Sequence, residues 1–264
     1  MKILYIAWQD PSSRSWFPVG RLTQKDGVFF FQYINGAEDA IKDSDFEPLG
    51  VFPELNKTYE SSTLFPIFQT RVLSPSRPDY PDFINWLGLS GSEIDPVELL
   101  SRSGGQSVTD RFEIFPYPDK LDDGSYHCHF FAHGLRHLPK EAIPRINTLK
   151  QGDRLYLANE FQNPYDRRAM VLCTEDHWLV GYCPRYLLHD VDDIAADPEK
   201  VVIRVEKDVL TSTPLQFRLL CCLTATWKDS EVPFRKPQYQ PITHDIERVP
   251  KYSIDILSLA GVEE

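Results

Sequence analysis

Residues 155–173 read LYLANEFQNPYDRRAMVLC, and this stretch indicates the fold of the C-terminal half of the chain. Two short apolar runs, Leu155–Asn159 and Ala169–Cys173, flank the polar loop Gln162–Asp166. Apolar runs of this length around a loop that contains proline, asparagine and aspartate are typical of neighbouring β-strands. The segment therefore predicts two strands that are joined by this loop.

Further strands are predicted on both sides of this pair. Short apolar runs occur at residues 126–131, 178–182, 201–205 and 216–226. Their close spacing is typical of a small β-barrel. A short helix is expected between the second and third of these runs, over residues 184–194.

The N-terminal half has a different pattern, with strands followed by short helices. A strand is expected at Ile3–Trp8, and the turn Lys25-Asp26-Gly27 predicts a β-hairpin. Asp95 before Pro96 is a favourable helix start, and Gly104-Gly105 a favourable end. Other short helices are expected at residues 67–73 and 83–87.

We therefore predict an α+β fold that is mostly β, in two domains. The 21 prolines disfavour long helices. The expected parts are an α+β domain at 1–115, a proline- and aspartate-rich linker at 116–124, a small β-barrel at 125–227 and a tail at 228–264.

The net charge of −11 is unevenly distributed. Residues 1–124 carry 11 basic and 19 acidic side chains, a net charge of −8, whereas residues 125–227 have a net charge of −1 and six of the seven histidines. Because a protein that coats DNA should be basic, this composition excludes that class. Only the C-terminal half offers room for a local basic site.

Composition also bears on location. The five cysteines form an odd set without disulfide-framework spacing, and no apolar run is long enough to span a bilayer. We therefore expect a cytoplasmic protein with no membrane contact, whose cysteines are small buried hydrophobes.

Four segments within residues 126–227 resemble the HIRAN domain, a module found in SWI/SNF-type helicases and in many bacterial proteins. They come in the order that the family has. They are Gly134-Leu135-Arg136-His137, Asn163-Pro164-Tyr165-Asp166 with Arg168-Ala169, Val180-Gly181-Tyr182-Cys183-Pro184-Arg185, and Pro214-Leu215.

The resemblance implies binding of the 3′ end of single-stranded DNA. It implies that Tyr165 stacks on a terminal base and that Asp166 accepts a hydrogen bond from the 3′-hydroxyl. His137 stands where the family has a second stacking tyrosine, and Tyr182 stands where a well-studied form has histidine. The implied DNA-binding residues are Arg136, His137, Asn163, Tyr165, Asp166, Arg168, Tyr182 and Arg185.

An alternative interpretation of the Asn163–Asp166 loop stays open. Asparagine and aspartate favour Asx turns, and proline restricts φ, so the same residues are good turn chemistry. In that case Tyr165 is a packing residue and Asp166 is a cap.

Residues 2–115 resemble the N-terminal subdomain of HipA-type toxin kinases. The matching segments include Val19-Gly20-Arg21-Leu22, Phe29–Tyr33, Leu64-Phe65-Pro66 and Gly104–Val108. The resemblance implies a protein partner such as a HipA-like kinase, within a bacterial toxin–antitoxin or phage-defence system. The family's catalytic portion has no counterpart here, so we expect no enzymatic activity. The alternative is an antitoxin-like protein that restrains such a kinase and has no role with DNA.

Two other groups of residues suggest a metal site or a nucleophile. The run His127, Cys128, His129, His133 and His137 invites a zinc site, but its spacing favours a solvated polar strand. Cys173 lies in an apolar run, which favours a core residue over a nucleophile. We therefore expect neither a metal nor another cofactor.

Overall fold

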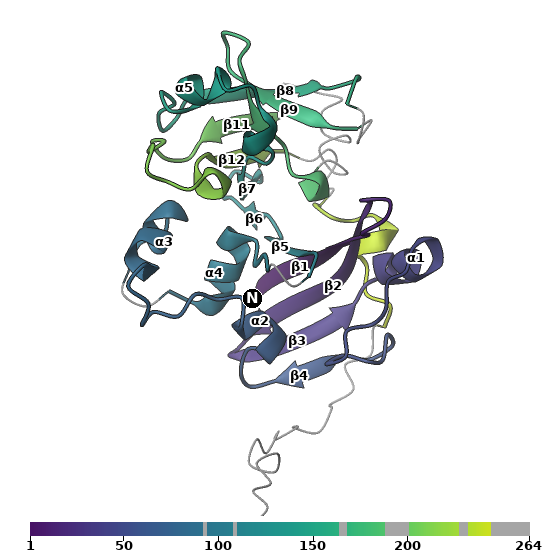
Figure 1. Ribbon diagram of the computed structural model, residues 1–264. Helices are drawn as coiled ribbons and strands as arrows, with labels where there is room; N and C mark the ends of the chain where they lie inside the picture. The colour runs from purple at the N-terminus through teal and green to yellow at the C-terminus, as the bar shows by residue number, and fades with distance from the viewer. Residues whose placement is uncertain (92–93, 108–109, 164–167, 188–200, 227–231, 244–264) are drawn as a thin grey trace, which may run out of the picture.

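A computed structural model describes residues 1–91, 94–107, 110–163, 168–187, 201–226 and 232–243 (Figure 1). The N-terminal half forms a five-stranded antiparallel sheet in the order β4-β3-β2-β1-β5. Its elements are β1 (Lys2–Gln9), β2 (Trp16–Lys25), β3 (Val28–Tyr33), α1 (Asn35–Asp43), β4 (Tyr59–Ser61), α2 (Pro66–Gln69), α3 (Tyr80–Trp86), α4 (Pro96–Ser103) and β5 (Phe112–Pro116).

The C-terminal half forms a seven-stranded antiparallel sheet in the order β10-β9-β8-β11-β12-β7-β6. Its strands are β6 (Asp119–Lys120), β7 (Tyr126–Phe131), β8 (Arg154–Asn159), β9 (Met170–Cys173), β10 (Leu179–Tyr182), β11 (Val201–Val205) and β12 (Leu220–Ala225). Its helices are η1 (Leu135–His137), α5 (Ala142–Ile146) and η3 (Leu215–Phe217), and η5 (Pro237–Tyr239) follows the sheet. The α+β, mostly β class is confirmed.

Short sequence motifs correctly predicted a turn and a capped helix in the N-terminal half. Asp26 and Gly27 both have positive φ, at 52° and 79°, as the two-residue turn between β2 and β3 requires. The Asp95 carboxylate accepts a hydrogen bond from the Val97 amide at 2.8 Å, and Gly104 ends α4 in the left-handed region. The expected hairpin and capped helix are therefore confirmed.

The expected closed barrel is not found among the described residues. The end strand β10 meets the chain just after β7 only at an isolated bridge between Tyr182 and His133. Gly134 follows with a φ of 73°, and this left-handed residue turns the chain out of the sheet into η1. The chain therefore leaves the sheet before a second pair of residues can form, and the sheet stays open.

One hydrophobic core cluster contains residues of both halves, at the junction that Figure 1 shows around β5 and β6, and the N-terminal half also has a core cluster of its own. Phe115 of β5 is fully buried and stacks on Tyr186, with ring centroids 4.1 Å apart and planes within 9°. Tyr5 of β1 contacts both Phe115 and Phe234. This shared core thus combines residues of both halves and of the C-terminal segment.

A second apolar contact joins α3 to the C-terminal sheet. Leu87 packs in one cluster with Phe131 and Leu220, and the rings of Phe83 and Trp86 lie against Phe217 of η3. The halves are therefore in contact at a second place besides the stack of Phe115 on Tyr186.

Polar contacts reinforce this junction. His133 Nε2 lies 3.1 Å from an Oε1 of the buried Glu113 carboxylate. Burial disfavours the imidazolium, but the neighbouring Glu113 outweighs it and raises the pKa of His133. Residues 119–120 of the expected linker form β6, so this segment pairs with β7.

The described part of the C-terminal segment packs against the N-terminal sheet. The Asn35 amide donates to the Gln240 carbonyl at 2.9 Å, and Ile34 forms a bridge with Pro241. None of the helices in the described ranges has the length and apolarity needed to cross a bilayer.

Candidate nucleic-acid interface

Tyr182 joins the segments that contain most of the predicted DNA-binding residues. Its backbone exchanges two hydrogen bonds with His133, at 2.9 and 3.0 Å. Its hydroxyl donates to Oε1 of Glu160 at 3.4 Å. Burial, together with the Glu160 carboxylate, raises the pKa of Tyr182, so the phenol stays a proton donor at neutral pH. Residues 133–137, 160–163 and 182–185 therefore meet at this side chain.

Gly134 allows the Tyr182 ring to lie close to the backbone. A Cβ atom at position 134 would lie 2.6 Å from Cδ2 of that ring. Gly134 also has a φ of 73°, which a residue with a Cβ adopts only at a cost. The glycine of the segment that resembles the HIRAN opening motif thus has a packing role and a backbone role.

Replacing Gly134 by alanine should lower the free energy of unfolding more than the matched change Gly152→Ala. Both glycines have positive φ, so both variants carry the roughly 1–2 kcal/mol cost of a left-handed residue. Only the Gly134 variant also meets the Tyr182 ring, which should add about 1–3 kcal/mol of overpacking. Urea denaturation of both variants measures this difference. Equal losses of unfolding free energy in the two variants would show that contact with the Tyr182 ring adds no cost.

The ends of the loop between β8 and β9 are fixed to each other. Glu160 donates its amide to the Ala169 carbonyl at 2.9 Å. Asn163 folds back onto Glu160, with Nδ2 donating to Oε2 at 2.5 Å and its amide donating to the Glu160 carbonyl at 3.0 Å. Glu160 therefore uses one carboxylate oxygen for Asn163 and the other for Tyr182.

The centre of this loop, which includes Pro164, Tyr165 and Asp166, lies outside the described residues. The alternative interpretation of this loop as a packed turn therefore stays open. The described ends bring Asn163 and Tyr182 together through Glu160, a residue that the sequence interpretation missed. The only sequence feature that could have identified Glu160 is a carboxylate directly after a strand and three residues before an asparagine.

The predicted cationic side chains have different surroundings. Arg136 and His137 are exposed on η1, and Arg136 Nε donates to His137 Nε2 at 3.0 Å. Arg168 is exposed at the end of the loop. Arg185 is half-buried, and its Nη1 donates to the Arg14 carbonyl of the N-terminal half at 2.8 Å. At least one N–H group of Arg185 therefore forms a hydrogen bond between the two halves.

Phe161 is a further candidate that the sequence interpretation missed. Its side chain is 82% exposed, although it lies one residue after Glu160 in the fixed part of the loop. A phenylalanine within the polar run Glu160–Asn163 is the signal that could have identified it. An exposed ring here offers a flat apolar surface to a base.

The histidines between residues 127 and 137, which the sequence suggested as a zinc site, do not converge on one point. His127 and His129 lie on one face of β7, while Cys128 is buried on the other. His133 pairs with Glu113, and His137 contacts Arg136. Desolvation by burial raises the pKa of the Cys173 thiol, which agrees with its interpretation as a packing residue.

Comparison with known families identifies the C-terminal half. Residues 125–221 match the family model of the HIRAN domain, so this part of the chain is assigned as a HIRAN domain. HIRAN domains are known for binding DNA, and the match supports a DNA-binding role in general terms. A search among curated proteins gave no match.

Two solved structures are similar to this part of the chain. The HIRAN domain of human HLTF has 16% sequence identity and a TM-score of 0.29, covering 40% of this chain and 81% of that one. A protein from Lactobacillus plantarum has 23% identity and a TM-score of 0.29, covering 39% of this chain and 97% of that one.

Proposed function

We propose that the HIRAN domain of this protein binds the 3′ end of single-stranded DNA. The family match over residues 125–221 carries the proposal. Support comes from Tyr182, which connects the three segments named by the resemblance through its backbone, ring and hydroxyl. These segments are distant in the sequence and would form one compact site.

In this proposal the terminal nucleotide is held by the loop between β8 and β9. Tyr165 stacks on the last base, and Asp166 accepts a hydrogen bond from the 3′-hydroxyl. A 3′-phosphate or an internal phosphodiester would bring negative charge against that carboxylate, so the loop selects a free hydroxyl end. Asn163 anchors the loop to Glu160.

The other predicted residues contribute to binding of the DNA end in different ways. The exposed guanidinium groups of Arg136 and Arg168 contact phosphates, with Arg185 at the boundary with the N-terminal half. Tyr182 acts as a positioning residue, because its hydroxyl is engaged by Glu160. Phe161 supplies a second stacking surface, in a chain where His137 replaces the family's second stacking tyrosine.

The charge of the chain limits how far DNA contact extends. With a net charge of −11, and −8 within residues 1–124, the N-terminal surface repels phosphate. Few phosphates are therefore neutralised, so binding should depend only weakly on salt. A pocket for a strand end fits this charge better than an extended groove does.

An oligonucleotide with a free 3′-hydroxyl should bind more tightly than the same strand with a 3′-phosphate. Fluorescence anisotropy with a 5′-labelled strand measures both affinities. Asp166→Ala should erase the difference in affinity because it removes the repelling carboxylate. Tyr165→Ala should lower the affinity for both strands alike. Equal affinity of the unaltered protein for the two ends would contradict end recognition.

We also propose that the N-terminal half docks on a protein and that the chain acts without catalysis. Its acidic surface favours a partner with a basic face. The resemblance of residues 2–115 to HipA-type subdomains suggests a HipA-like kinase in a toxin–antitoxin or phage-defence system. Co-purification from the native cell tests this idea, and an eluate without a kinase-like protein would remove its basis. A captured kinase without oligonucleotide binding would favour the antitoxin-like alternative.

A further inference from the structure

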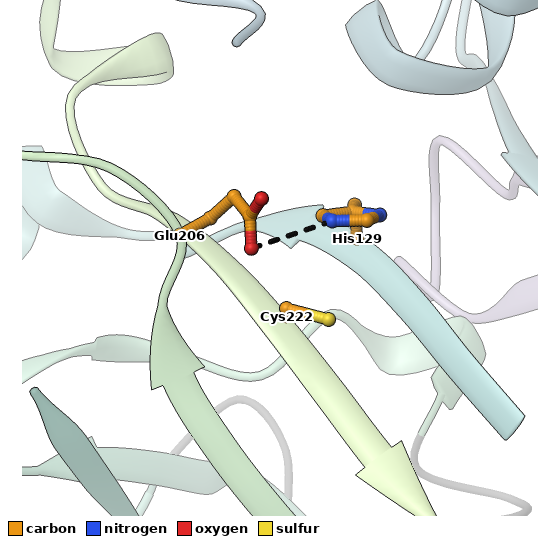
Figure 2. Close-up of side chains that lie close together, drawn as sticks. All are labelled: His129, Glu206 and Cys222. Carbon is orange, nitrogen blue, oxygen red and sulfur yellow. Dashed lines mark ion pairs between the residues drawn. The ribbon is translucent and has the colours of Figure 1, made fainter. Parts of the chain in front are cut away.

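Three side chains with metal-binding atoms converge on the outer face of the C-terminal sheet (Figure 2). His129 lies on β7, and Cys222 is its direct cross-strand partner on β12. Glu206 follows β11, and its amide donates to the Leu220 carbonyl at 2.9 Å, which holds it beside β12. The backbone of three neighbouring strands therefore fixes the positions of these residues.

The distances are close to those of a metal site. Nε2 of His129 and Oε2 of Glu206 are 3.4 Å apart, and the ligand atoms of all three residues lie within 4.8 Å of one another. Around tetrahedral zinc, bond lengths of about 2.0–2.3 Å place two ligands roughly 3.5 Å apart. Each separation therefore exceeds the tetrahedral value by at most about 1.3 Å, a range that side-chain rotation can close.

The chemistry of the three groups also fits zinc. Imidazole nitrogen, thiolate sulfur and carboxylate oxygen are all ligands that zinc takes in proteins. A thiolate and a carboxylate together supply two negative charges, which neutralise a divalent cation. When the metal binds, the Cys222 sulfur gives up its proton to solvent and forms the sulfur–metal bond.

The cluster is accessible to an ion. The side chains of His129 and Glu206 are 19% and 37% exposed. His129 also lines a cavity of about 320 Å³ between β7 and α4, together with Arg102 and His127. Three protein ligands leave one position of a tetrahedral site open, which a solvent molecule can fill.

We propose that His129, Cys222 and Glu206 form a zinc site with one solvent ligand. Such a site links β7, β12 and the end of β11 on the face away from the domain core. It is independent of the proposed DNA contacts, which lie around Tyr182 and the loop between β8 and β9. It also uses a set of residues different from the histidine run in the sequence.

Cobalt(II) is the probe for this site. The full-length protein, stripped with a chelator and kept reduced, should bind one equivalent and show a thiolate-to-cobalt charge-transfer band with visible bands of tetrahedral cobalt. Zinc should displace it and raise the melting temperature. Cys222→Ser should abolish the charge-transfer band. His129→Ala and Glu206→Gln should each weaken zinc binding by more than the roughly 10–100-fold that is typical of losing an outer-shell partner.

Cys173→Ser is the matched control, because Cys173 is also partly buried but lies on β9, away from the cluster. This variant should retain the band and the affinity. Glu206→Gln alters a partly exposed side chain, so it tests the site even if the cysteine variant fails to fold. Absence of the band in the unaltered protein, its persistence in Cys222→Ser, or unchanged zinc affinity in Glu206→Gln would overturn the proposal.

Discussion

Replacing Phe115 by alanine should lower the free energy of unfolding by about 3–5 kcal/mol, as expected for removal of a buried aromatic ring. Phe115 has no exposed surface and stacks on Tyr186, while Tyr5 and Phe234 contact its edges and face. The cavity would open at the junction of the two halves. Urea denaturation followed by far-ultraviolet circular dichroism and by tryptophan fluorescence measures the loss.

Two comparisons make this result specific. Phe115→Leu keeps most of the apolar volume and should cost less than Phe115→Ala. Both optical signals should change in one transition, because one core cluster spans both halves. Separate transitions in the unaltered protein, or a loss below about 1 kcal/mol in Phe115→Ala, would show that the junction contributes little.

Replacing Phe161 by alanine should reduce the affinity for single-stranded DNA by about 5- to 150-fold, which corresponds to the 1–3 kcal/mol of one stacked base. Because the ring is 82% exposed, the change should alter the free energy of unfolding by no more than about 0.5 kcal/mol. A loss of binding would then come from the lost ring and not from unfolding. Fluorescence anisotropy with the free 3′-hydroxyl strand measures the effect.

Two further variants act as controls for this measurement. Phe161→Tyr retains an aromatic face and should bind within a few-fold of the unaltered protein. Trp178→Ala removes another exposed aromatic side chain, at the turn before β10, and should leave DNA binding unchanged. If Phe161→Ala binds as tightly as the unaltered protein, Phe161 is not part of the interface.

Features that depend on neighbouring residues could be predicted from the sequence. Asp26-Gly27 specifies a two-residue turn, and Asp95-Pro96 with Gly104 specifies where α4 begins and ends. The alternation of short apolar runs and polar loops placed the strands from β7 to β12. In each case the signal and the structure lie within a few residues of each other.

Features that depend on distant residues were missed. The helix α1 has no side-chain cap at Ile34, and it forms because Ala37 and Ala40 pack into the core. The stack of Phe115 on Tyr186 and the pair of Glu113 with His133 join residues from different halves. The hydrogen bond from Tyr182 to Glu160 and the cluster around His129 likewise need the folded sheet. No local pattern encodes these partners.

The shared core limits how freely this HIRAN domain can be exchanged by recombination. Its inner surface is completed by Tyr5 and Phe115 from the N-terminal half and by Phe234 and Tyr239 from the C-terminal segment. A transplanted HIRAN domain without an aromatic residue at the position of Tyr186 would leave the Phe115 ring without this stacking partner. We therefore expect each half to constrain the substitutions that the other half tolerates.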